Sequence, residues 1–291
     1  MIPKSTNHLF WQSIHAGAVA AGRDFKVEIL WNGPAVEGDY SRQIQIFESM
    51  LARHVDGIAV SASDRTALTA SLDRAAAANI PVTVYDSGLN STNYMTYIAT
   101  NNDEAGRIAA RKMAELIGGK GDVGLVLHMP GSLSTGDREV AFEDVIAKEY
   151  PGIHIVARQY GMSDRLRSMA AAENILTAHP DLKGLFCSSE PSTLGTAQAL
   201  KERNLSGKVK FIGFDSSEGM IADLRGGTLD AIVVQDPFKI GYEAVRTLVD
   251  KRNGKTPPRQ IDLHARVVTK ADLNLPDVKL LLFRDLGKYL N

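Results

Sequence analysis

Cysteine is almost absent from this 291-residue chain, which contains Cys187 alone and therefore forms no internal disulfide. Cys187 ends the apolar run from Gly184, a position that predicts a buried, inert thiol rather than a nucleophile. Long hydrophobic runs are absent too, since no stretch of ~18 apolar residues marks a membrane span. A chain without disulfides is compatible with the cytosol and with a bacterial periplasm.

The signatures of common enzyme chemistry are also missing. The chain has no G-x-x-x-x-G-K-[ST] phosphate loop, and no G-x-G-x-x-G follows a predicted strand. The segment 131–136 holds serines among glycines but is not a nucleophile elbow. The 7 histidines form neither an H-E-x-x-H nor an H-x-H pair, so no zinc or iron site is predicted. We therefore expect a binding protein with no cofactor and no metal.

Neither sign of charge dominates the chain. The formal net charge is -1, which gives no electrostatic reason to expect nucleic acid or an anionic membrane as a partner. Hydrophobic residues make up 44% and charged residues 23%, an ordinary globular composition. The length suits about two domains, at ~150 residues for each.

Strand and helix patterns alternate along most of the chain, which predicts an α/β fold with parallel sheets. A glycine-rich break at 118–121 separates two series of these units and predicts two such sheets. Among the expected elements are a strand at Phe25–Trp31, a helix at Asp137–Glu149 and an extended segment at Gln260–Val268.

The amino-terminal segment is short for its expected role. A parallel sheet normally begins with a full strand, yet only Met1 to about Lys4 precede the first helical region. We expect the numbered chain to start inside its first strand, with any export signal lying upstream.

Two distant stretches share one pattern. Segments 80–88 and 210–217 each predict a short apolar strand followed directly by aspartate and serine. In open α/β sheets the ligand lies outside the carboxyl ends of the strands. Asp86 and Asp215 are therefore predicted to face a ligand, and the alternative for Asp86 is a helix cap.

Four further side chains suit binding without chemistry. Phe10 and Trp11 are adjacent in a predicted helix and therefore point ~100° apart, so one of them should face a cleft. An aromatic face there fits the C–H groups of a sugar. The alternative is that both side chains are buried. Arg138 is predicted at a helix start, where the dipole disfavours a cation, which indicates a compensating role as a donor to sugar oxygens. Gln235 ends a predicted strand, where its amide can donate and accept, or can form a hinge hydrogen bond.

With these positions in place, the sequence resembles the ribose-type periplasmic sugar-binding proteins, the type I solute-binding proteins of ABC importers. They share a fold with the effector domains of LacI-type repressors. The resemblance covers nearly the whole chain, and the order and spacing of its pieces carry it. These pieces are segments 7–17, 57–64, 80–87, 97–102, 137–142, 176–181, 212–215 and 234–238.

The resemblance implies two doubly wound parallel-sheet lobes joined by three crossings, near residues 100–102, 235–236 and 262–264. The N-terminal lobe would comprise residues 1–101 plus 236–262, and the C-terminal lobe residues 102–235 plus 263–291. Ligand would bind between the lobes and favour their closure by a hinge motion.

The same resemblance implies a set of site residues. Phe10 and Trp11 would stack on a sugar ring, and its hydroxyl groups would bond to Asp86, Arg138, Asp215 and Gln235. A wider set of expected ligand-binding residues comprises Lys4, Asn7, Ser61, Ser87, Asn101, Ser189 and Glu190. Ser61 and Ser189 stand where the ribose-binding pattern commonly has asparagine, and Ser87 where it commonly has arginine. These smaller groups favour a larger or differently substituted sugar over ribose.

The function implied is that of the extracytoplasmic binding component of an ABC importer. Such a protein is a monomer, catalyses nothing, takes a neutral monosaccharide or polyol and docks on a membrane permease. Lys4 resembles the start of autoinducer-2 binders, so a furanose-like signal is one alternative. The effector domain of a LacI-type regulator is another and requires a helix-turn-helix upstream. A sugar-modifying enzyme is disfavoured because no acid, base and nucleophile set can be placed.

Overall fold

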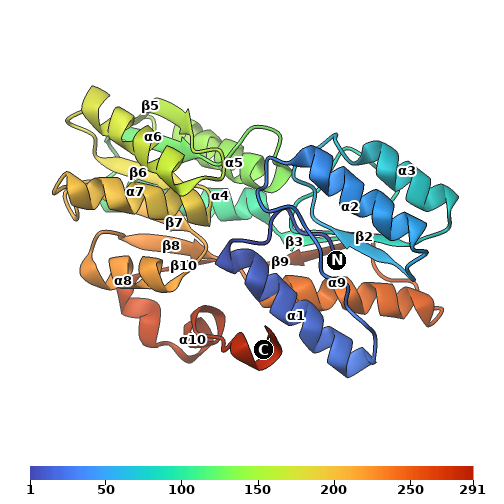
Figure 1. Ribbon diagram of the computed structural model, residues 1–291. Helices are drawn as coiled ribbons and strands as arrows, with labels where there is room; N and C mark the ends of the chain where they lie inside the picture. The colour runs from blue at the N-terminus through green and yellow to red at the C-terminus, as the bar shows by residue number, and fades with distance from the viewer. Residues whose placement is uncertain (291) are drawn as a thin grey trace.

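The computed structural model describes residues 1–290 and contains two sheets flanked by helices (Figure 1). The first sheet has four parallel strands in the order β1-β2-β3-β9. Its elements and their helices are α1 (Leu9–Phe25), α2 (Tyr40–Ala52), β1 (Ile58–Val60), α3 (Thr69–Ala77), β2 (Val82–Tyr85), β3 (Thr96–Thr100), α9 (Pro237–Arg252) and β9 (Gln260–Leu263).

The second sheet has six strands in the order β10-β8-β7-β6-β4-β5, of which only β10 is antiparallel to its neighbour. This half of the molecule contains α4 (Asn102–Ile117), β4 (Gly121–Leu127), α5 (Leu133–Glu149), β5 (Ile153–Tyr160), α6 (Arg165–Ala178), β6 (Gly184–Cys187), α7 (Glu190–Glu202), β7 (Lys210–Phe214), α8 (Glu218–Gly226), β8 (Ala231–Val234) and β10 (Arg266–Val268). The chain ends in η1 (Lys270–Asn274), α10 (Pro276–Leu282) and α11 (Gly287–Leu290). The predicted α/β architecture with parallel sheets is confirmed.

The strands are apolar because helices cover both faces of each sheet. In β2, Val84 packs with Phe47 of α2 and Leu72 of α3, while the next residue, Tyr85, packs with Ile240 of α9 on the opposite face. Successive side chains of a strand point to opposite faces, so a strand covered on both sides buries every residue. All four residues of β2 are buried.

Two glycines bring helices into backbone contact. A Cβ on Gly17 of α1 would lie 1.9 Å from the Phe238 carbonyl oxygen of α9, so the close packing of these helices requires that position 17 lack a side chain. In the other half, a Cβ on Gly106 of α4 would lie 2.2 Å from the Arg138 carbonyl oxygen of α5. Gly106 thus sets the distance at which α5 presents Arg138.

The expected strand at Phe25–Trp31 is wrong. The helix α1 continues through Phe25, and residues 26–31 form no strand. On one side they bond to the start of the chain, where the Met1 amine donates to the Leu30 carbonyl at 2.9 Å and the Asn32 N–H donates to the Met1 carbonyl at 3.2 Å. A segment with one short partner lacks the continuous ladder that defines a strand.

The chain passes between the two halves at three places before its final segment. β3 leads into α4 near Asn101, β8 leads into α9 through Gln235 and Asp236, and β9 leads into β10 through His264 and Ala265. The final turn, α11, returns to α1, where Arg23 donates to the Lys288 carbonyl at 2.9 Å (Figure 1). Within residues 1–290, no helix combines the length and apolarity needed to cross a membrane.

Candidate functional site

Polar side chains gather where the strands of both sheets end. Asp86 follows β2, while His128, Asp215 and Gln235 follow β4, β7 and β8. Both sheets direct these ends toward one cavity between the two halves, as expected for a ligand site in α/β folds. The residues that line it are Lys4, His8, Phe10, Trp11, Glu37, Asp86, His128, Ser134, Thr135, Arg138, Ser189, Glu190, Pro191, Asp215 and Gln235.

Asp86 and Asp215 occupy equivalent places in the two sheets. Each adopts a left-handed backbone conformation directly after its strand, with φ of 59° and 72°, which aspartate tolerates better than most residues. The Asp86 N–H donates to the Ile98 carbonyl of β3 at 2.7 Å, and the Asp215 N–H donates to the Val233 carbonyl of β8 at 2.8 Å. The last hydrogen bond of each ladder therefore fixes the residue whose carboxylate lines the cavity.

Hydrogen bonds orient the Asp215 carboxylate. One oxygen accepts from the Gln235 amide at 2.6 Å and the other from the Glu190 N–H at 3.0 Å. The Gln235 carbonyl oxygen accepts from the Thr100 hydroxyl at 2.6 Å, which ties this pair to the end of β3. Asp215 and Gln235 thus form one pre-ordered polar surface. The Asp215 carboxylate accepts hydrogen bonds, and the Gln235 amide N–H holds that carboxylate in place.

Arg138 lies within α5 rather than at its start. The helix begins at Leu133 instead of Asp137, because Ser132 acts as its N-cap residue and its carbonyl accepts from the Gly136 N–H at 3.2 Å. The argument that the helix dipole disfavours Arg138 is therefore wrong, since that effect is confined to the first turn.

The guanidinium of Arg138 is buried and held on three sides. Its Nε donates to the Asn102 Oδ1 at 2.7 Å, and one Nη donates to the Ser188 carbonyl at 2.9 Å. The group lies 3.9 Å from the centroid of the Phe214 ring. Such fixation leaves its remaining N–H groups in one orientation at the cavity wall, where they can donate to a bound oxygen.

The two aromatic rings at the start of α1 are perpendicular. Phe10 and Trp11 have ring centroids 5.1 Å apart and an interplanar angle of 85°. Trp11 is 3% exposed and its indole N–H donates to Glu37 Oε1 at 3.0 Å, while Phe10 is only partly buried. Both line the cavity, but perpendicular rings cannot both lie flat on one sugar ring, so the expectation that both stack in this way does not fit the geometry.

Lys4 reaches across the cavity from one half to the other. Its ammonium donates to Ser132 Oγ at 2.9 Å and to Ser134 Oγ at 3.4 Å, and it lies 4.0 Å from Asp86 Oδ2. The same Asp86 oxygen accepts from Ser61 Oγ at 2.9 Å. Lys4 and Ser61 together orient the Asp86 carboxylate at the cavity.

Four members of the wider predicted set do not line the cavity, namely Asn7, Ser61, Ser87 and Asn101. Asn101 caps α4 by accepting from the Glu104 N–H at 3.0 Å, and it is the next residue, Asn102, that contacts Arg138. Asn7 is exposed, and Ser87 is buried behind the wall. Lys4, Ser189 and Glu190 do line the cavity.

Sequence reasoning missed Glu37 and His128, which form a contact between the two halves. Glu37 Oε2 lies 2.9 Å from His128 Nε2, and His128 Nδ1 lies 2.9 Å from Ser189 Oγ. The available signal was the place of His128 directly after β4. Glu37 carried no signal, because it lies in a long loop without a motif.

Glu190 caps a helix across the cavity. The N-terminus of α1 has no side-chain cap of its own and no acidic residue in its first turn. Glu190 Oε2 accepts from the Phe10 N–H at 3.2 Å and so meets one of the free donors at that helix end. Burial and the nearby Asp215 carboxylate raise the pKa of Glu190 to about 7.

The remaining carboxylates respond differently to burial. Burial raises the pKa of Asp86, opposed by Lys4 and Arg138, and raises that of Asp215, opposed mainly by Arg138. Burial also acts to raise the pKa of Glu37, but the charge and hydrogen bond of His128 outweigh it and hold that pKa well below its usual value. The Glu37 carboxylate is therefore ionised and bonded to His128.

The cavity is small in this arrangement, with a volume of about 30 Å³. A monosaccharide can enter only when the two halves separate or the walls move outward. The wall chemistry, with paired cations and carboxylates beside two aromatic rings, suits hydroxyl groups and an apolar ring face. Within residues 1–290, no group of three or more His, Cys, Asp or Glu side chains has the arrangement of a metal site.

The sequence profile of the periplasmic binding protein domain matches residues 1–256 of this chain. The ribose import binding protein of Bacillus subtilis is 27% identical over 267 residues, which cover 91% of this chain and 84% of that protein.

Solved structures agree with this match over almost the full length. A carbohydrate transporter solute-binding protein from Agrobacterium radiobacter, in complex with D-arabinose, has a TM-score of 0.94 and 33% identity, covering 97% of both chains. An ABC transporter solute-binding protein from Agrobacterium vitis, with bound D-fucose, has a TM-score of 0.94 and 32% identity, covering 97% of this chain and 98% of that one.

Proposed function

The chain belongs to the periplasmic binding protein domain family, and from this premise we propose that it is the extracytoplasmic sugar-binding component of an ABC importer. Its ligand is a neutral monosaccharide or polyol, held in the cavity between the two halves. The protein catalyses no reaction and acts by delivering bound sugar to a membrane permease.

The charges of the side chains that line the cavity favour a neutral ligand. Two cations, Lys4 and Arg138, face two carboxylates, Asp86 and Asp215. Of the other two carboxyl groups in the lining, Glu37 contacts His128, and Glu190, with its pKa raised to about 7, is uncharged below that pH. A charged ligand would leave one of these buried groups without a counterpart, which is costly in a desolvated site, whereas hydroxyl groups can bond to both signs.

The relatives support the same ligand class. The structures from Agrobacterium contain D-arabinose and D-fucose, which are both uncharged sugars, and the Bacillus subtilis relative is a ribose import binding protein. Of the three serines that depart from the ribose-binding pattern, Ser189 lines the cavity, and its side chain is smaller than the asparagine expected for a ribose site, so we propose a sugar other than ribose.

We assign residues 1–101 plus 236–262 to an N-terminal lobe and residues 102–235 plus 263–290 to a C-terminal lobe, whose last turn, α11, packs back on α1; residue 291 of the expected lobe lies outside the described residues. This division is supported by the membership of β1, β2, β3 and β9 in one sheet and of the other strands in the second. Hinge bending at the three crossings opens the cavity. The closed monomer then presents one rim from each lobe to the permease.

Thermal unfolding against a panel of pentoses, hexoses, polyols and autoinducer-2 tests the proposal. We expect at least one neutral sugar to raise the Tm, because a ligand that binds only the folded state stabilises it in proportion to ln(1 + [L]/Kd). Sugar acids and amino sugars serve as charged controls of similar shape. A Tm raised only by the charged compounds would contradict a neutral ligand, and consumption of a stabilising sugar would contradict a binding role.

A further inference from the structure

The last residues of the described chain make a fourth connection between the two lobes (Figure 1). α10 belongs to the C-terminal lobe, because its Val278 is fully buried in the core of that lobe, with Leu281 and Leu282 packed against the same core. The chain then runs without regular structure over residues 283–285 and forms α11 beside α1 of the N-terminal lobe. We call residues 283–290 the C-terminal strap.

The N-terminal lobe holds the strap through Arg23 of α1 and Phe238 of α9. The Arg284 guanidinium lies 3.9 Å from the centroid of the Phe238 ring, and the Tyr289 ring centroid lies 5.1 Å from the same point. Arg23 donates to the Lys288 carbonyl at 2.9 Å and to the Tyr289 carbonyl at 3.3 Å. All of these side chains are partly or fully exposed, so the contacts can break without opening a core.

Adjacent residues of the strap contact opposite lobes. The Phe283 ring centroid lies 5.9 Å from the guanidinium of Arg225, which belongs to α8 in the C-terminal lobe. The next residue, Arg284, contacts Phe238 in the N-terminal lobe. One extended residue spans at most ~3.6 Å, so this crossing has no slack that could absorb a separation of the lobes.

A cavity of about 450 Å³ is lined both by the strap and by residues of the sugar site. Its lining includes Phe10 of the N-terminal lobe, Asp215 of the C-terminal lobe and residues 281–286. Phe10 and Asp215 also line the sugar cavity, where Glu190 joins them by accepting from the Phe10 N–H and donating its own N–H to the Asp215 carboxylate. The strap therefore spans the same gap between the lobes as the sugar site, and opening of that gap pulls on the strap.

The two attachments of the strap differ in strength. On the side of the C-terminal lobe it follows α10 and η1, whose Val278 and Leu273 are buried in the core, so detachment there would expose apolar surface to water. On the side of the N-terminal lobe it is held by the exposed contacts of Arg23 and Phe238. The attachment to the N-terminal lobe is therefore the one that breaks when the lobes separate.

We propose that the C-terminal strap is a releasable connection that stabilises the closed state. Its contacts with Arg23 and Phe238 form on closure and break on opening, so their free energy adds to the preference for the closed state. A sugar held between the lobes can leave only after they separate, so the strap slows its dissociation and raises its affinity. This consequence rests on the proposed function, in which the sugar binds between the lobes.

A double variant of the full chain, Arg284→Ala with Tyr289→Ala, removes both side chains that contact Phe238. We expect the Kd for sugar to rise about tenfold, with faster dissociation in stopped-flow fluorescence, because a cation–π contact and an aromatic pair are lost. In the wild type, sugar should slow amide hydrogen exchange at Tyr289 and Leu290, whose N–H groups donate to the Leu286 carbonyl in the strap. Exchange within α10 should not change.

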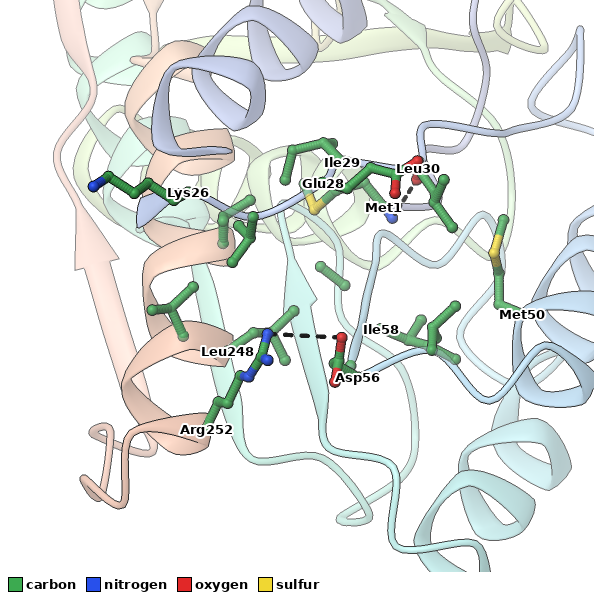
Figure 2. A pocket seen from close by; sticks show the side chains of 16 residues that line it. Met1, Lys26, Glu28, Ile29, Leu30, Met50, Asp56, Ile58, Leu248 and Arg252 are labelled. Atoms are coloured by element: carbon green, nitrogen blue, oxygen red, sulfur yellow. Dashed lines mark hydrogen bonds and ion pairs between the residues drawn. The ribbon is translucent and has the colours of Figure 1, made fainter. Parts of the chain in front are cut away.

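Two further variants serve as matched controls. Tyr289→Phe keeps the ring that contacts Phe238 and should bind sugar as the wild type does. Arg252→Ala removes an exposed arginine that pairs with Asp56 in the N-terminal lobe (Figure 2), and it should also leave sugar binding unchanged. Arg252 is the last residue of α9 and Phe238 the second, so roughly 20 Å of helix separates them.

Equal Kd values and dissociation rates for the double variant and the wild type would overturn the proposal, as would tighter binding by the double variant or strap amides that do not respond to sugar. A wild type that binds no sugar would instead contradict the proposed function, and the strap is then tested in the free protein. The Phe10 N–H, which bonds to Glu190 across the cleft, should exchange faster in the double variant, and equal rates would reject the strap.

Discussion

Glu37 and His128 meet across the cleft, with Glu37 Oε2 2.9 Å from His128 Nε2. Both side chains are buried, and they come from opposite halves of the chain. Trp11 donates to the other Glu37 oxygen, and His128 contacts Ser189 through its second ring nitrogen. This chain of contacts can exist only when the halves are together, so it stabilises the closed state relative to the open one.

The first prediction concerns this contact. Glu37→Gln removes the negative charge but keeps the shape, and a charge-assisted hydrogen bond is about twice as strong as a neutral one. We expect sugar affinity to fall by roughly tenfold, equivalent to about 1.4 kcal/mol, mainly through faster dissociation. Titration calorimetry and stopped-flow fluorescence measure these quantities.

Glu143→Gln, which breaks an exposed pair with Arg158, is the matched control and should leave affinity unchanged. Equal affinity of Glu37→Gln and wild type would refute the role of the contact.

A second prediction concerns the Asp215 carboxylate, which accepts from Gln235 and from the Glu190 N–H. In Asp215→Asn, an NH2 group replaces one carboxylate oxygen and faces either the Gln235 amide or the Glu190 N–H, both of which are donors. The substitution therefore breaks this hydrogen-bond network and removes an oxygen that could accept from the sugar. We expect the sugar-induced rise in Tm to disappear. Ser61→Ala, which removes one donor to Asp86 behind the wall, should only reduce it. A full ligand-induced shift in Asp215→Asn would place the ligand elsewhere.

The third prediction is a pH dependence carried by Glu190. Its pKa is raised in the folded state from 4.5 to about 7, so the folded state loses stability relative to the unfolded chain as pH rises through this window. The loss approaches roughly 3 kcal/mol above pH 7 and is absent below pH 4.5. Asp215, Glu37 and the start of α1 face this carboxyl group.

Urea unfolding of wild type and Glu190→Gln at several pH values isolates this effect. Because groups distant from Glu190 titrate equally in both proteins, the difference in unfolding free energy reports Glu190 together with its coupling to Asp215. We expect wild type to lose stability relative to Glu190→Gln between pH 5 and pH 8. A difference that stays constant with pH would show that Glu190 ionises normally.

The fourth prediction tests how α5 presents Arg138. A Cβ on Gly106 would lie 2.2 Å from the Arg138 carbonyl oxygen, so Gly106→Ala must push α5 away from α4. We expect destabilisation of about 1–3 kcal/mol, together with weaker sugar binding because Arg138 moves. Gly226→Ala is the matched control, since no atom lies within 4 Å of its added Cβ. If Gly106→Ala retains wild-type affinity and stability, close packing of α4 and α5 does not position the arginine.

The sequence predicted the parts of the fold that depend on local patterns. Apolar runs followed by Asp86 and Asp215 indicated strands that end at a ligand cleft, and both residues line the cavity. The expected strand at 25–31 had the right composition but lacks a full partner, which no local pattern reveals. The start of α5 was misplaced because Ser132 was not recognised as the N-cap residue.

Contacts between the halves were beyond prediction from the sequence. Glu37 lies in a loop and gains its role from Trp11 and from His128, the latter 91 positions later. The wider predicted set contained Asn101, whereas the adjacent Asn102 holds Arg138, because helix periodicity and not proximity in sequence decides which side chain turns inward. The perpendicular packing of Phe10 and Trp11 likewise follows from tertiary contacts.

The central claim is that a neutral sugar binds between the halves, and isothermal titration calorimetry of the sugar that stabilises the protein most tests it directly. We predict saturable binding of one sugar per chain in the wild type and no measurable binding in Asp86→Asn or Asp215→Asn. Undiminished binding in both variants, or the absence of binding by every neutral sugar and polyol, would contradict the account.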